Sequence, residues 1–156
     1  KIENKKGFGL LDGDVDIDVI RETCKIVSIT EKEIENIPTL LRNEKIITIE
    51  DIVPEVIFKE AVFRIYELEC NRRRNCSLKI DELPMDCPRV KNLESFFANK
   101  FQAKKHKLLK MDIARNISEL LSETDINSME AKLWKDAKTL ISILEDKFDI
   151  NDTINP

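Results

Sequence analysis

The stretch PEVIFKEAVFRIYELEC, residues 54–70, decides the fold, because it predicts a helix with almost no polar face. Apolar residues recur at three- and four-residue spacing, and they continue around most of the predicted helix. A helix that is apolar nearly all round is buried among other elements. Thr48 and Asp51 mark its start, and Pro54 fits the first turn, where a proline removes no helical hydrogen bond. We therefore expect the rest of the chain to pack around this segment.

Three downstream segments predict further helices. Residues 90–101, 109–121 and 129–148 each carry one apolar stripe at helical spacing, with charged residues on the opposite side. Short connections separate the predicted helices, and this arrangement favours antiparallel helical hairpins.

Upstream of the central helix the pattern is less regular. Thr30 and Glu33 form a capping box, which predicts a short helix over 31–44. Residues 14–27 begin with alternating apolar residues and then change to helical spacing. A helix is favoured there, and a strand over 14–20 is the alternative.

The composition favours the same class of fold. The 156 residues are 42% apolar and 36% charged, and they include only three glycines, so a soluble helical protein is favoured over a turn-rich β architecture. We expect an all-α fold of antiparallel helical hairpins, arranged as a bundle or a short solenoid-like stack.

The expected domain organisation is simple. Residues 1–13 hold all three glycines and are predicted to be a linker or N-terminal extension. Residues 14–150 are expected to form one helical domain, with a division into 14–102 and 103–150 as the alternative. Residues 151–156 are expected to be a frayed tail.

Charge and cysteine content narrow the class of protein. The net charge of −4 gives no overall attraction to nucleic acid or to an anionic membrane, and no apolar run is long enough to cross a bilayer. Four cysteines without paired spacing and a single histidine predict no metal site and reduced thiols. A cytoplasmic or nuclear location is expected. The chain lacks an initiator methionine and is expected to be a piece of a longer protein.

Catalytic motifs are missing from the sequence. It contains no glycine-rich phosphate loop, no G-x-S-x-G and no H-E-x-x-H. The acidic run at 12–18 resembles the opening of a calcium loop, but Ile17 and Thr23 stand where glycine and glutamate are required. We therefore expect a protein that is not an enzyme and that has no cofactor.

Two basic clusters are candidates for binding nucleic acid, since lysine and arginine neutralise phosphates. Their residues are Arg72, Arg73, Arg74, Lys104, Lys105 and Lys107. Charge runs between helices are more often only solvated, and no aromatic residues alternate with these to stack on bases.

The stretch DELPMDCPRVKNLESFF, residues 81–97, interrupts the helical pattern with two prolines. Pro88 fits the first turn of the next helix, and Asp86 is placed to cap the backbone N–H of Arg89. This structural interpretation leaves Glu82 without a role.

The order E-x-x-x-D-x-P, followed by a helix with paired aromatics, resembles the second half of the MA-three domain. That all-helical module occurs in translation initiation factor four-G and in the programmed-cell-death-four protein, and the similarity covers about residues 39–101. The resemblance implies binding to a DEAD-box RNA helicase of the initiation factor four-A type, through an acidic loop. Carried over by position, Glu82 and Asp86 are the acids that pair with helicase arginines, with Asp81 and Arg89 beside them.

The favoured expectation is thus a non-enzymatic scaffold that binds another protein, such as a DEAD-box helicase, through an acidic loop and so affects translation or RNA processing. The first alternative is a helical nucleic-acid-binding domain that uses the two basic clusters. The second is a structural subunit of a larger complex.

Overall fold

The computed structural model describes residues 9–16, 18–20, 22, 34–123 and 131–148. Within these ranges the protein is mostly helical, as predicted, with one small parallel sheet that was not predicted. The antiparallel hairpin arrangement stays a prediction.

The chain folds into two compact units. The terminal unit combines residues 1–49 with 135–156, and the central unit spans 50–134. The alternative boundary expected after residue 102 therefore lies inside the central unit, because the helix that follows it packs on the central helix.

The terminal unit contains the sheet. Strand β1 (Gly9–Leu11) pairs in parallel with β2 (Ile34–Asn36), and Gly9 lies opposite Ile34. Part of the expected linker at 1–13 thus belongs to a folded element. The prediction of helix over 31–44 is wrong for Ile34–Asn36, which form the second strand.

Helix α2 (Ile37–Leu41) begins directly after this strand for a local reason. The side-chain oxygen of Asn36 accepts the N–H of Thr39 at 3.0 Å and so caps the helix. Pro38 lies in the first turn, where its missing N–H costs nothing. A helix running through Pro38 from further upstream would lose that hydrogen bond.

Helix α6 (Lys135–Phe148) packs against α2 in the same unit, where Leu140 is buried. Lys147 Nζ lies 2.5 Å from Glu35 Oε1 and joins the helix to β2. The predicted helix over 129–148 is confirmed from Lys135 onward.

Two upstream predictions are only partly covered. In the segment 14–27, residues 18–20 and 22 are helical, as expected, whereas residues 14–16 are not, and the alternative of a strand is wrong for 18–20; residues 17, 21 and 23–27 lie outside the described residues. The capping box of Thr30 and Glu33 also lies outside them.

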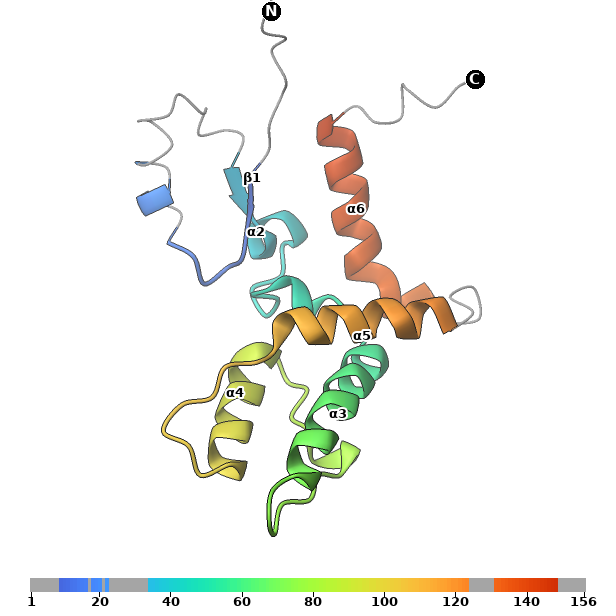
Figure 1. Cartoon of the computed structure of the whole chain (residues 1–156). Helices are drawn as coiled ribbons and strands as arrows, with labels where there is room; N and C mark the ends of the chain where they lie inside the picture. Colours follow the sequence, from blue (N-terminus) through green and yellow to red (C-terminus); the bar gives the residue numbers. More distant parts are fainter. Residues whose placement is uncertain (1–8, 17, 21, 23–33, 124–130, 149–156) are drawn as a thin grey trace, which may run out of the picture. The chain divides into compact units, whose positions relative to one another are not determined.

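The central unit is built from three helices. These are α3 (Glu55–Asn71), α4 (Arg89–Lys100) and α5 (Lys110–Glu123). Figure 1 shows α5 running across α3, and the stacked rings of Tyr66 and Phe97 join α3 to α4. The helices predicted over 90–101 and 109–121 are therefore confirmed.

Short 3₁₀ turns complete the central unit. They are η2 (Ile49–Asp51), at its boundary with the terminal unit, η3 (Ile80–Glu82) before α4, and η5 (Ala131–Trp134).

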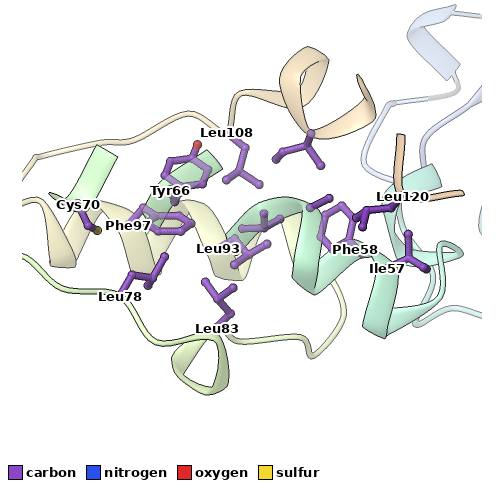
Figure 2. Close-up of a cluster of buried hydrophobic side chains, with 13 residues drawn as sticks. Ile57, Phe58, Tyr66, Cys70, Leu78, Leu83, Leu93, Phe97, Leu108 and Leu120 are labelled. Carbon is purple, nitrogen blue, oxygen red and sulfur yellow. The ribbon is translucent and has the colours of Figure 1, made fainter. Parts of the chain in front are cut away.

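The core of the central unit forms along one side of α3. Buried side chains from α3, from α4 and α5, and from the loops between them meet there (Figure 2). The fully buried members are Phe58, Ala61, Val62, Tyr66, Cys70, Leu93 and Phe97. The opposite side of α3 is open, since Leu68 is 60% exposed and Val56 is 57% exposed. The expectation that α3 is buried on nearly all sides is thus wrong for this face.

Arg89 ties the segment that leads into α3 to the start of α4. Its side chain is buried, and its guanidinium donates to the backbone oxygens of Glu50 at 3.2 Å, Val53 at 2.5 Å and Met85 at 3.2 Å. Its backbone N–H donates to Asp51 Oδ1 at 2.8 Å. A single residue therefore holds the segment before α3 against the start of α4.

The prediction that Asp86 caps α4 is wrong. The carboxylate at the N–H of Arg89 comes from Asp51, far away in sequence, while the Asp86 backbone oxygen accepts from Asn92 at 2.8 Å. A cap needs only an acceptor beside the free N–H groups, and here the tertiary fold supplies it.

We expect Arg89→Met to lower the free energy of unfolding by about 2–4 kcal/mol, because several buried carbonyl oxygens lose their donors. Urea unfolding followed by circular dichroism measures the change. Lys91→Met is the matched control, since Lys91 is exposed on the same helix and should change stability by less than about 0.5 kcal/mol. Equal effects of the two substitutions would refute the role given to Arg89.

Candidate nucleic-acid interface

The structure places the first basic cluster against Phe101, which begins the loop that carries the second. The guanidinium of Arg73, in the loop after α3, lies over the ring of Phe101, at the end of α4, with 4.1 Å between guanidinium carbon and ring centroid. We call the surface formed by both clusters the basic end. Its members are Arg72, Arg73, Arg74, Lys104, Lys105 and Lys107, and all six are exposed.

A tight turn at the C-terminus of α4 sets the path of the loop that carries Lys104, Lys105 and Lys107. The N–H of Gln102 donates to Asn99 at 3.1 Å, and the N–H of Ala103 donates to Ala98 at 2.8 Å. Gln102 has φ 53°, so the helix ends in a left-handed residue, as in a Schellman motif. The chain therefore turns sharply after α4, just before the lysines of the loop.

Side chains of α3 and α4 hold the far end of the same loop. The Tyr66 hydroxyl oxygen accepts the N–H of Leu109 at 3.1 Å and lies 3.1 Å from His106 Nε2. Glu94 Oε1 accepts the N–H of Leu108 at 3.2 Å. The three lysines are thus carried by a loop that is attached at both ends.

An aromatic cluster lies beneath the basic end. Tyr66 stacks on Phe97 with ring centroids 3.8 Å apart, and Phe101 stacks on Phe97 at 5.5 Å. The His106 ring meets Tyr66 and Phe101 edge-on at 5.5 Å and 5.3 Å. Figure 2 shows Tyr66 and Phe97 facing each other within the core. These rings give the two loops a common rigid support.

Charge is distributed very unevenly along the chain. Residues 70–79 and 95–110 contain nine lysines and arginines and no acidic residue. All remaining residues together carry a formal charge of −13, because the whole chain carries −4. A local surface of this kind attracts polyanions even though the bulk charge does not.

Some of these cations already have partners. Arg73 pairs with Glu69 at 2.7 Å, and Lys100 with Glu82 at 2.5 Å. The other five members of the basic end show no ion pair within the described part of the chain.

A groove adjoins the basic end, between α3 and α5. Its volume is about 640 Å³, which lies in the range of small-ligand sites. Apolar side chains, two arginines of the basic end, the charged side chains of Arg64 and Glu69 on α3, and polar groups of α5 line it. The residues used below are Ile65, Leu68, Arg72, Leu109, Asp112 and Asn116.

The acidic residues singled out in the sequence are not members of the basic end, but Glu82 pairs with Lys100, the residue before Phe101. Asp81, Glu82 and Asp86 are all exposed. The hydrogen bond from Lys100 lowers the pKa of Glu82, and Lys59 lies 3.9 Å from Asp81. These two carboxylates are therefore partly neutralised by lysines of their own chain.

Arg89 does not belong to an exposed site with these acids. The residue is 8% exposed, and its Nε and Nη1 groups donate to backbone oxygens of the same unit. The residue predicted to contact a partner is therefore a structural one in this fold.

The three described cysteines are not joined in disulfides. Cys70, Cys76 and Cys87 are free thiols, and burial raises the pKa of Cys70 to about 12. A thiol held in its protonated form is a poor nucleophile. In the ranges that the structure describes, no group of three or more histidine, cysteine or acidic side chains is arranged to hold a metal ion.

Comparisons with known proteins leave the family open. No family model matches the chain, and neither curated proteins nor solved structures gave a match. The resemblance to an MA-three domain therefore stays a prediction. None of the described helices has the length and apolar character needed to cross a membrane.

Sequence reasoning found the members of the basic end but missed what joins them. Phe101 ends the apolar stripe predicted over 90–101, and no sequence pattern places His106 beside it. The absence of acidic residues from both basic segments was the signal available in the sequence. No sequence pattern predicted the groove, because its position depends on which face of α3 the other helices leave uncovered.

The buried phenol supplies a pH-dependent prediction. Burial raises the pKa of Tyr66 from 10.0 to about 12, so the stability it contributes is present below pH 10 and is lost as the pH rises toward 12. Tyr66 is the only tyrosine of the chain, so phenolate absorbance reports on it alone. We expect a midpoint near 12 in buffer and near 10 in concentrated denaturant. A midpoint near 10 with intact circular dichroism would contradict the buried environment of Tyr66.

Proposed function

We propose that the central unit is a non-enzymatic module that binds single-stranded nucleic acid at the basic end. The observation that carries this proposal is the contact of Arg73 with Phe101, because it joins two acid-free basic segments into one surface. Such a surface neutralises successive phosphates and gains affinity from the release of counterions.

The distribution of charge supports a defined binding orientation. With a formal charge of −13 on the remaining residues, a polyanion is repelled elsewhere and is steered to the basic end. A module of this kind would act in the cytoplasm or the nucleus.

A single strand fits this surface better than a duplex does. The cations of the basic end lie on loops that follow α3 and α4, or at the junction with α3, and not along one face of a helix. A helix that enters the major groove carries its contacts along such a face. Loops that present separated cations suit a flexible strand, whose phosphates can adjust to them.

Fluorescence anisotropy with labelled 12-nucleotide strands tests the proposal. With about six phosphate contacts, the logarithm of the association constant should fall with the logarithm of salt concentration with a slope of about −4. Arg72→Glu/Lys105→Glu should weaken binding by at least about tenfold and make the slope shallower.

The control for this double variant is Lys135→Glu/Lys138→Glu, which makes the same change of charge on exposed residues of α6. We expect it to retain nearly full affinity. Equal losses in both double variants would mean that only net charge matters. No binding at low salt would refute the proposal.

A second candidate function is the binding of a basic partner protein by the acidic loop. The most specific version of this proposal is that the partner is a DEAD-box helicase. One observation favours it: the loop is fixed between Glu82 and Asp86, by the buried Leu83 and by Arg89 holding the backbone oxygen of Met85. Carboxylates on a rigid loop lose little entropy when they accept arginines.

The test uses Glu82→Lys/Asp86→Lys with a purified DEAD-box helicase of the initiation factor four-A type. We expect a loss of about 2–5 kcal/mol in binding with an unchanged unfolding midpoint. Lys100→Gln is the control, because it breaks the same ion pair of Glu82 but retains the acid. A loss of stability that matches the loss of binding would show that the acids are structural.

A further inference from the structure

The groove between α3 and α5 is continuous with the basic end. Arg72 and Arg73 belong to both, so a strand bound across the basic end passes the mouth of the groove. The apolar part of the lining is Ile65, Leu68 and Leu109, and Leu68 and Leu109 are 60% and 44% exposed. Apolar surface of this size beside phosphate-binding residues suits a flat base that leaves the strand.

The α5 side of the groove offers hydrogen-bond acceptors. Asp112 and Asn116 lie one turn apart on this helix. The Asn116 side-chain amide donates to the backbone oxygen of Asp112 at 3.1 Å, so its own oxygen remains as an acceptor. The Asp112 carboxylate is 48% exposed, and Arg115 approaches one of its oxygens only to 3.6 Å.

We infer that this groove binds a guanine base of the strand held by the basic end. Guanine presents two neighbouring donors, its N1–H and its N2 amino group, and these match a carboxylate with a second acceptor beside it. Adenine and cytosine each present one amino group next to a ring acceptor, and uracil places its only donor between two carbonyl oxygens. The apolar floor contacts the face of the base, and Arg72 lies within reach of its phosphate.

This inference rests on the proposed function, and its test separates the two. The probes are three uridine 12-nucleotide strands that carry one central guanosine, inosine or adenosine, together with the all-uridine strand. Inosine lacks only the N2 amino group. We expect the guanosine strand to bind about tenfold more tightly than the adenosine strand, with inosine between them.

Substitutions in the groove sharpen the test. Asp112→Asn should remove the preference for guanosine and leave the affinity for the all-uridine strand unchanged. Glu119→Gln is its control, an exposed acid of the same helix outside the groove. Leu68→Ala should weaken the guanosine strand, whereas Met111→Ala should not, since Met111 is exposed but does not line the groove. Thermal unfolding checks that all four variants fold.

The outcomes are distinct. Equal affinity for all four strands, with no effect of Asp112→Asn, overturns the guanine site and leaves the proposed function intact. No binding of any strand overturns both. Guanosine monophosphate is the remaining probe, since a free nucleotide offers the same base. If it binds as tightly as the guanosine strand, and Lys105→Glu weakens neither, the groove serves a free nucleotide and the inference is wrong.

Discussion

The buried side chain of Arg89 is the interaction on which the central unit depends. A guanidinium shielded from water is costly unless its donors are used, and here three backbone oxygens of Glu50, Val53 and Met85 accept from it. The backbone N–H of the same residue is capped by Asp51. The start of α4 is thereby held against the segment that leads into α3, and this fixes how the two helices pack.

The consequences of that packing appear at the other end of the helices. Because α3 and α4 lie together, Tyr66 stacks on Phe97, and Phe101 reaches the guanidinium of Arg73. The Tyr66 hydroxyl then holds the loop that returns to α5. Two basic loops, separated in sequence by the whole of α4, thus share one aromatic support. The candidate interface is a product of helix packing and not of any local motif.

The unequal distribution of charge explains why this surface could attract a polyanion. A net charge of −4 suggested no affinity for polyanions, but the net value averages over a basic region and a strongly acidic remainder. For the acids on the loop before α4, the fold reduces the charge that the sequence suggests is available. They were prominent in the sequence, yet Lys100 and Lys59 lie against two of them in the fold. Ion pairs within the chain, and the packing that gathers like charges on one surface, therefore decide which charged residues can bind a partner.

The sequence by itself determined the helices of the central unit, because apolar residues at helical spacing define α3, α4 and α5 wherever their stripes are long and regular. It also identified every member of the basic end. It did not determine the strand at Ile34–Asn36, which needs β1 as a partner, or the cap that Asp51 provides to Arg89. Only the tertiary structure decided these, together with the open face of α3 that forms the groove, because each depends on residues that are distant in sequence and that only packing brings together.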